Sequence, residues 1–456
     1  MVLMDDRNTL TCHGPRQRAI QAMKDSLGAQ TRAGWVARSS PLLSGSFFST
    51  RCTALILLGS ERFETFWTRE RVNAMRHENS VLHQILKHVP WAHFDRLVEE
   101  RGADKHVRRL TTKSQFVALV YGQLSGAASL REIEAGQRSH QLRLYHVGAR
   151  PVKRSTLSDA NALRPAEVFT ALFALMVKGA HRGLRRALAD TVYLIDATLV
   201  RLDESSAHWA RYCSGVCGAK VHVIYDPDAD QPIYAAISGA NVNDITPAQA
   251  MPIEPGATYV FDLAYYDYGW WAKLDQLACR IVTRFKKNTP LNVIEELSVP
   301  KDGPILSDRI GFLPARQAKS RRNPMQDAVR EVRVRIETGK ILRILSNDLD
   351  ATAQEIADLY KRRWAIELFF RWVKQNLKIR HFLGTSENAV RTQVAVALIV
   401  FLLLRLAQAA QNLIKSPLAF ARLVRINLMN RRRLDRLLEP DAPLPPNEAQ
   451  MALQWT

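Results

Sequence analysis

A row of polar residues lies within the segment from Thr352 to Arg380. At about 100° of rotation per residue, these residues fall on one narrow stripe of a helix, and most of the remaining surface is apolar. Burying unpaired charge is costly, so the stripe is expected to line a cleft or form a paired network in a largely buried helix. It holds a tyrosine, a carboxylate and four cations: Tyr360, Arg363, Glu367, Arg371, Lys374 and Lys378.

Two aspartates are candidates to join Glu367. Asp196 ends a predicted buried strand that begins at Val192, and Asp262 ends another that begins at Thr258. If these strands are neighbours, both carboxylates project from one end of a sheet. Three carboxylates are suited to Mg²⁺ or Mn²⁺, and they can hold two ions about 3.5–4 Å apart that assist the attacking and leaving oxygens of a phosphodiester. The neighbouring cations would then bind a phosphate backbone.

A simpler interpretation stays open for each of these residues. An aspartate at the end of a strand often caps the element that follows it. Glu367 could pair with Arg363 and Arg371, each four residues away along the helix, and do nothing more. On that interpretation the segment contains ordinary ion pairs and no cation site.

The elements that would position the carboxylates form a mixed sheet. The first three predicted strands are joined by turns, which favours antiparallel pairing, whereas the last two are about 20 residues apart with a helix between them, which is βαβ spacing. Strand-like runs continue from 288 to 345, before the helix that carries Glu367. The prediction is a five-stranded α/β sheet with a mostly β insertion, its strands lying at 192–195, 219–225, 232–237, 258–261 and 280–283.

Other parts of the chain differ in pattern. Residues 1–74 are an irregular extension, and apolar residues recur at helical spacing from Asn79 to about Lys178. The predicted domains are a helical domain at 75–185, a catalytic domain at 186–430 and a tail at 431–456. Two interpretations of the helical domain are equally well supported. One is a helical bundle with solvated basic loops, and the other is a surface that reads DNA. The apolar run Val394 to Leu404 is too short to cross a membrane and predicts a buried helix.

Composition favours a nucleic-acid partner. The 456 residues include 64 Lys plus Arg against 44 Asp plus Glu, a formal net charge of +20. Such an excess is typical of proteins that bind polyanions, although a basic surface that only maintains solubility is an alternative. Five scattered cysteines and the absence of a secretory signal pattern indicate the cytoplasm.

The spacing Tyr360-x2-Arg363-x3-Glu367-x6-Lys374 resembles the Y-R-E-K signature of the IS-four family of bacterial insertion-sequence transposases. The resemblance extends from about His77 to about Leu406. It implies an RNase H-like catalytic fold, a helical N-terminal DNA-binding domain and a DDE triad of Asp196, Asp262 and Glu367. Its further implications are double-stranded DNA as partner, at element ends and target, and a homodimer on that DNA. The expected DNA contacts are Tyr360, Arg363, Lys374, Lys378, Arg371, Arg284 and Lys286.

The chain departs from that family at both aspartates. The family has Asp-Ser-Thr where this chain has Asp196-Ala197-Thr198, and Asp-Arg-Gly-Tyr-x-Asp where it has Asp262-Leu263-Ala264-Tyr265-Tyr266-Asp267. Residues 288–345 contain no Trp to stack on a flipped base, and Phe312 is the one aromatic residue there. Three hypotheses follow: an active transposase, a DNA-binding remnant without activity, and a general RNase H-like nuclease. The helical N-terminal half favours the first over the third.

Overall fold

The computed structural model describes residues 79–182, 191–213, 216–300, 302–318, 321–377, 382–411 and 413–439. One compact unit comprises residues 78–334 and 343–456. Of the second unit, only residues 335–342 are described, and they form a turn with Gly339 at φ 77°. The predicted extension at 1–74 lies outside the described residues, as does the predicted tail from residue 440 onward.

The described chain begins with a group of helices, as predicted from the apolar spacing. The side chain of Thr111 caps one of them by accepting a hydrogen bond from the Ser114 amide, and Gly126 ends the same helix in the left-handed conformation. Phe94, Phe116 and other rings form the interior of the group. The helices are α3 (Val81–Leu86), α4 (Trp91–Glu100), α5 (Thr112–Ser125), α6 (Leu130–Ser139), α7 (Gln141–Leu144), η1 (Tyr145–Val147), α8 (Arg154–Leu163) and α9 (Glu167–Arg182).

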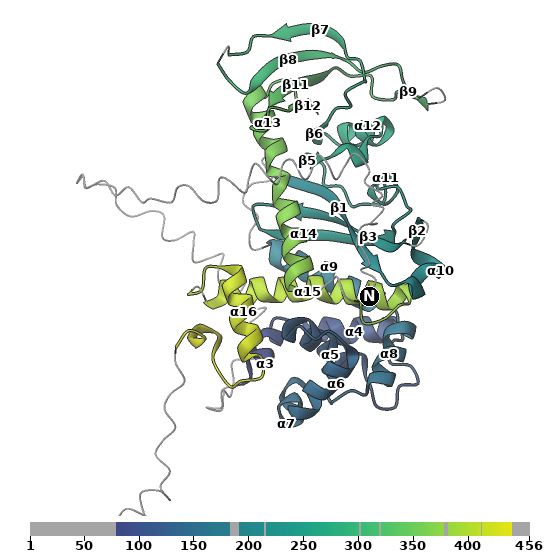
Figure 1. Cartoon of the computed structure of the whole chain (residues 1–456), viewed down its shortest axis with the longest axis vertical. Helices are drawn as coiled ribbons and strands as arrows, with labels where there is room; N and C mark the ends of the chain where they lie inside the picture. Colours follow the sequence, from purple (N-terminus) through teal and green to yellow (C-terminus); the bar gives the residue numbers. More distant parts are fainter. Residues whose placement is uncertain are drawn as a thin grey trace, which may run out of the picture. The chain divides into compact units, whose positions relative to one another are not determined.

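A large mixed sheet follows (Figure 1). Within the described part of the chain it has ten strands, nine of them in the order β2-β3-β1-β5-β6-β12-β11-β8-β7. The tenth, β4, pairs with β3 along the edge opposite β1. A separate short pair joins β9 to β10. The strands are β1 (Val192–Leu202), β2 (Arg211–Cys213), β3 (Val216–Asp226), β4 (Gln231–Gly239), β5 (Thr258–Phe261), β6 (Arg280–Arg284), β7 (Asn292–Leu297), β8 (Ile305–Phe312), β9 (Arg316–Ala318), β10 (Arg321–Arg322), β11 (Val329–Arg335) and β12 (Ile341–Ser346).

The five predicted core strands are confirmed. Strand β3 pairs antiparallel with β1 and β4, whereas β5 pairs parallel with β1 and β6. The order β4-β3-β1-β5-β6, with these directions, is that of an RNase H-like fold. The predicted β-rich insertion is also present, but it continues the core sheet because β12 pairs antiparallel with β6.

Helices cover both faces of the core sheet. On one face, α11 (Ile245–Ala248) contributes Ala248, and α12 (Tyr268–Gln276) contributes aromatic side chains, to a hydrophobic cluster that includes Tyr193 and Ile195 of β1. On the other, α14 (Trp364–Asn376), which follows α13 (Ala353–Arg362), places Phe369 and Phe370 beside Val223 (Figure 1). Because side chains alternate along a strand, the even-numbered positions of β1, including Asp196, belong to the α14 face. Short helices η3 (Glu204–Ser206), α10 (Ala207–Ala210) and η4 (Leu263–Tyr265) lie in the connections.

Helix α15 (Glu387–Gln411) is a core helix of the protein, as predicted from Val394 to Leu404. It is long and apolar enough to cross a membrane, but 78% of its most apolar window is buried within the structure. Its neighbours include α5, α8, α9 and α14. The described chain ends with α16 (Pro417–Asn427) and η5 (Leu434–Arg436).

Candidate active site

Two aspartates and an arginine occupy one row across three strands. Ile195 of β1 lies opposite Phe261 of β5, and Phe261 lies opposite Thr283 of β6. One position further along each strand, the chain has Asp196, Asp262 and Arg284. The parallel register therefore brings together the two aspartates that the sequence singled out, with a basic residue beside them.

The two aspartates differ in local setting. Asp262 follows β5 directly, as predicted, and its Oδ1 accepts a hydrogen bond from the Ala264 amide at 2.8 Å, so it also caps η4. Asp196 does not end its strand, and that prediction was wrong. Strand β1 continues to Leu202 because β3 pairs with it as far as Cys217. Asp196 is 6% exposed within this ladder.

The segment that carries Glu367 is two helices, whereas the sequence predicted a single helix from Thr352. The break falls at Arg363, whose amide bonds to the Tyr360 carbonyl three residues earlier at 3.1 Å. The predicted deep burial was also wrong for part of α14. One face packs against the sheet, but Leu368 is 45% exposed on another.

Arg363 links Glu367 to Asp196. Its Nη2 donates to Glu367 Oε1 at 2.6 Å, and its Nη1 donates to Asp196 Oδ2 at 3.3 Å. The residue is only 8% exposed, and its Nε is buried without a hydrogen-bond partner among the described residues. Burial opposes the charged form, but the Tyr360 phenol and three carboxylates, including that of Asp262, raise the pKa of Arg363 above its ordinary value.

Tyr360 and Arg284 lie beside this group. Tyr360 is 5% exposed, and the Arg363 guanidinium lies 5.8 Å from the centre of its ring. Burial raises the pKa of the Tyr360 hydroxyl, while the charges of Arg363 and Arg284 lower it and that of Asp262 raises it. The buried Nε of Arg284 lacks a hydrogen-bond partner within the described chain. These residues therefore form one electrostatic cluster with the carboxylates.

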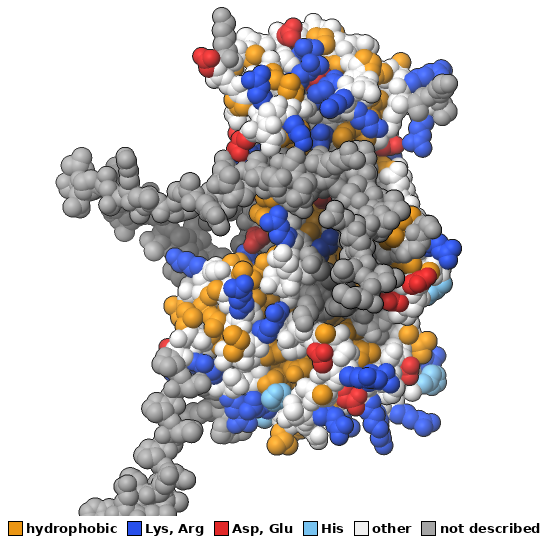
Figure 2. All heavy atoms as spheres, viewed as in Figure 1, with side chains coloured by type: hydrophobic (Ala, Val, Ile, Leu, Met, Phe, Trp, Pro, Cys, Tyr) orange, Lys and Arg blue, Asp and Glu red, His pale blue; other side chains and the backbone are white. Residues whose placement is uncertain are grey.

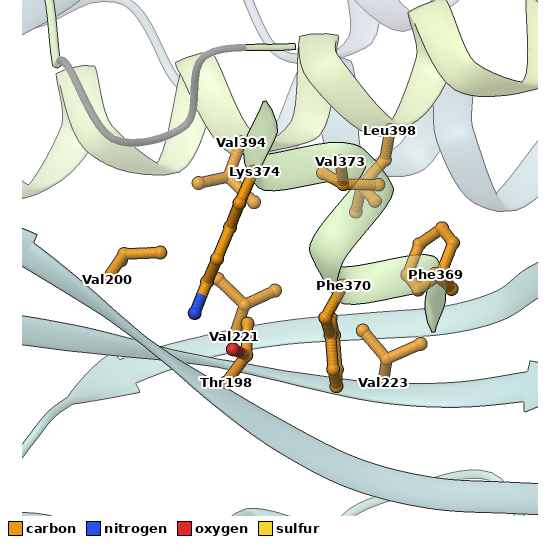
Figure 3. Close-up of a pocket in the computed structure, with 10 residues that line it drawn as sticks. All are labelled: Thr198, Val200, Val221, Val223, Phe369, Phe370, Val373, Lys374, Val394 and Leu398. Carbon is orange, nitrogen blue, oxygen red and sulfur yellow. The ribbon is translucent and has the colours of Figure 1, made fainter. Parts of the chain in front are cut away.

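Lys374 extends from α14 toward β1. Figure 3 shows its amine beside Thr198, which is two residues after Asp196 on the same face of the strand. The other walls of this small pocket are apolar and include Val221 and Phe370. Lys374 therefore lies near the aspartate face of β1, as its place in the polar stripe predicted.

The remaining predicted cations are more dispersed. Arg371 is exposed, and its guanidinium lies 5.6 Å from the centre of the Trp364 ring. Lys286 is also exposed, with its amine 4.1 Å from the centre of the Tyr266 ring. Lys378 lies outside the described residues. The structure thus groups Tyr360, Arg363 and Arg284 with the carboxylates, and leaves Arg371 apart from them.

The loop after Asp262 is firmly anchored despite its departure from the family pattern. Tyr265 is fully buried, and its carbonyl accepts a hydrogen bond from Trp271 Nε1 at 3.0 Å. The Tyr266 hydroxyl donates to Thr289 Oγ1 at 3.0 Å. Contacts further along the loop therefore hold it in place without the Arg and Gly that the family has after the aspartate.

The insertion contains a buried ion pair that sequence reasoning missed. Arg330 donates from Nε and Nη2 to the two carboxylate oxygens of Asp308 at 2.8 and 2.6 Å. Arg330 also donates to the carbonyls of Leu349 and Ala351, just before α13. This pair ties the insertion to the segment that leads to Glu367. Phe312 is 41% exposed at the end of β8 and has no assigned role.

The three carboxylates suit a hard divalent cation in chemical type. Among the residues that the structure describes, however, no three acidic, His or Cys side chains are close enough together to hold a metal ion. The Arg363 guanidinium bridges Asp196 and Glu367 instead. A cation therefore already lies between two of the candidate ligands, which fits a site that attracts positive charge. No pattern in the sequence indicates the Arg363–Asp196 contact, which joins residues 167 positions apart.

Comparisons with known proteins identify the family of the chain. The transposase DDE domain family matches residues 188–403, and a domain family of unknown function matches residues 77–150. A Sinorhizobium fredii protein named as a transposase is 38% identical over 289 residues, which cover 62% of this chain and 80% of that protein. A Geobacillus stearothermophilus protein named as a transposase for insertion sequence element IS5377 is 30% identical over 261 residues, covering 55% of this chain and 66% of that protein.

A solved structure also aligns with the chain. It is the cryo-EM structure of a piggyBac transposase synaptic complex with hairpin DNA, at 12% sequence identity and a TM-score of 0.39. The alignment covers 82% of this chain and 83% of that one. The similarity is too distant to assign the fold, which rests on the strand order and directions described above.

Proposed function

Since the chain belongs to the DDE transposase family of bacterial insertion sequences, we propose that Asp196, Asp262 and Glu367 are its catalytic carboxylates. As an insertion-sequence transposase it is an enzyme that acts on DNA. The observation that carries the residue assignment is the parallel register of β1 and β5, which places Asp196 beside Asp262. Glu367 is linked to Asp196 through Arg363, which forms an ion pair with each of them.

DDE transposase domains use divalent metal ions. For this chain the proposed ions are two Mg²⁺, or Mn²⁺ in their place, held by the three carboxylates. Bound there, such ions supply Lewis-acid stabilisation to the attacking and leaving oxygens of a phosphodiester. The protein fixes Asp196 by strand pairing and Asp262 by its capping bond, so these ligands are oriented before DNA arrives.

The proposed substrate is double-stranded DNA, at the ends of the element and at the target. The enzyme cleaves a strand at each end and joins the freed 3′-hydroxyl to the target strand, acting as a homodimer in the cytoplasm. The helical domain at 75–185 binds the ends, and the domain at 186–430 carries the chemistry. The proposed DNA contacts are Tyr360, Arg363, Lys374, Lys378, Arg371, Arg284 and Lys286.

The Arg and Lys side chains of the surface support this assignment and predict strong salt dependence. Figure 2 shows many such side chains over strands β7 to β12 and over the N-terminal helices. A protein that contacts about 6–10 phosphates loses roughly 10³- to 10⁵-fold in affinity between about 50 and 200 mM salt, because binding releases counterions. With a net charge of +20 the same behaviour is expected here, measured by fluorescence anisotropy of a labelled duplex. A nearly flat plot of log K against log salt would contradict it.

The test of the proposed function uses the DNA that flanks the gene. Inverted repeats found there define a duplex with one element end, and the purified protein should cleave this duplex in Mg²⁺ and not in EDTA. An unrelated duplex of equal length is the control. Equal cleavage of both duplexes would support a general nuclease, and binding without cleavage would support a remnant.

A further inference from the structure

Arg363 occupies an unusual position for a residue expected to bind DNA. Its guanidinium is buried between Glu367 and Asp196, where a phosphate cannot contact it without a rearrangement. Resting on the catalytic assignment above, we propose that Arg363 is an internal counter-ion of the carboxylates. Metal ions that bind the carboxylates displace its guanidinium, which then pairs with a DNA phosphate. Metal binding and DNA binding would be coupled through this one side chain.

The first argument concerns charge. Negative charges held close together repel one another, so a cation among the carboxylates of Asp196, Asp262 and Glu367 offsets their mutual repulsion. A buried charge is tolerated when it is paired, and Arg363 provides that pairing. It does so by engaging Glu367 Oε1 and Asp196 Oδ2, the same kind of oxygen that a divalent ion would take as ligand. Arg363 and the metal therefore compete for the same atoms.

The second argument concerns where the guanidinium goes. Its bond to Asp196 is long, at 3.3 Å, and its Nε has no hydrogen-bond partner within the described residues, so the buried position does not satisfy all of its donors. A guanidinium can bind phosphate through two parallel hydrogen bonds. Such a pair would engage the N–H donors of Arg363 that make a long bond or no bond in the buried position. Arg363 also lies at the break between α13 and α14, where the backbone already departs from regular α-helix.

The coupling has a thermodynamic consequence. If metal ions release Arg363 to DNA, then metal raises the affinity for DNA, and DNA raises the affinity for metal by the same factor. A typical coupling between two sites is about 5- to 150-fold in affinity. Removing the Arg363 charge should therefore strengthen metal binding in the absence of DNA and abolish this mutual effect.

The first experiment measures Mg²⁺ binding without DNA by isothermal titration calorimetry. Arg363→Gln should bind Mg²⁺ on the order of tenfold more tightly than the native chain, since the competing cation is gone. Arg363→Lys keeps a charge and should stay close to native. Arg362→Gln is the matched control, because the neighbouring Arg362 pairs with Asp228 at the surface and its loss should leave Mg²⁺ affinity unchanged.

Thermal unfolding reports on the same competition independently of binding heat. In EDTA, Arg363→Gln should melt at a lower temperature than the native chain, because its carboxylates have lost their counter-ion. Mg²⁺ should then raise the melting temperature of Arg363→Gln by more than it raises that of the native chain. Equal shifts in the two proteins would count against the inference. If Arg363→Gln does not fold, the native chain still tests it, because a DNA affinity that divalent ions do not raise would overturn the coupling.

The second experiment measures coupling to DNA by fluorescence anisotropy with a short unrelated duplex. Ca²⁺, which also binds carboxylate oxygens, should raise the DNA affinity of the native chain about fivefold or more and that of Arg363→Gln hardly at all. If Arg363→Gln binds Mg²⁺ no more tightly and keeps the Ca²⁺ effect, the inference is overturned and the catalytic assignment stands. If the native chain binds no divalent ion even with DNA, the catalytic assignment falls as well.

Discussion

Glu367→Gln is expected to reduce Mg²⁺-dependent strand cleavage by a factor on the order of 10³ or more, while DNA binding stays close to native. Gln has nearly the size and helix propensity of Glu but lacks the charge that a divalent ion requires of its ligand. The basic residues around the site remain, so the duplex should still bind. Cleavage of an element-end duplex and anisotropy at fixed salt, on the same preparation, measure the two effects.

A matched control comes from α15. Glu387 also forms an ion pair with an arginine four residues away, Arg391, at 2.6 Å, but this pair is exposed. Glu387→Gln should cost only about 0.2–0.5 kcal/mol and leave cleavage intact. If Glu367 were merely the partner of Arg363, the two variants would behave alike, and retained cleavage in Glu367→Gln would remove Glu367 from the proposed triad.

Much of the catalytic half could be predicted because its signals are local. Each core strand is a short apolar run, and the spacing between runs separates hairpins from βαβ units. This was enough to place the five strands, the antiparallel pairing of the first three, the parallel pairing of the last two, and Asp262 at the end of β5. The type and spacing of Tyr360, Arg363, Glu367 and Lys374 then pointed to the helix that packs against the sheet.

The features that were missed depend on contacts between distant parts of the chain. Strand β1 runs past Asp196 because β3 is there to pair with it, and the insertion joins the sheet because β12 meets β6. No local pattern encodes either pairing. The contact between Arg363 and Asp196 was missed for the same reason, since helical periodicity cannot report that a guanidinium will reach a strand.

The buried pair in the insertion provides the second large prediction. Asp308→Asn is expected to lower the free energy of unfolding by about 3–5 kcal/mol, because it leaves the charge of Arg330 buried without its counter-charge. Arg330 and Asp308 are 5% and 2% exposed. In the native chain the hydrogen bonds that Arg330 donates to Asp308 raise the pKa of Arg330. In the variant the guanidinium still cannot escape the cost by losing its proton, because arginine stays protonated in proteins. Urea unfolding followed by circular dichroism measures the change.

The adjacent residue supplies the control. Arg309 pairs with Glu296 at 3.1 Å, but the Glu296 side chain is 65% exposed, so Arg309→Gln should change the unfolding free energy by less than about 1 kcal/mol. Arg330 also holds the carbonyls of Leu349 and Ala351 ahead of α13, so Asp308→Asn should loosen the approach to Glu367 as well as the insertion. Similar unfolding curves for the two variants would mean that the buried pair contributes no more than a surface one.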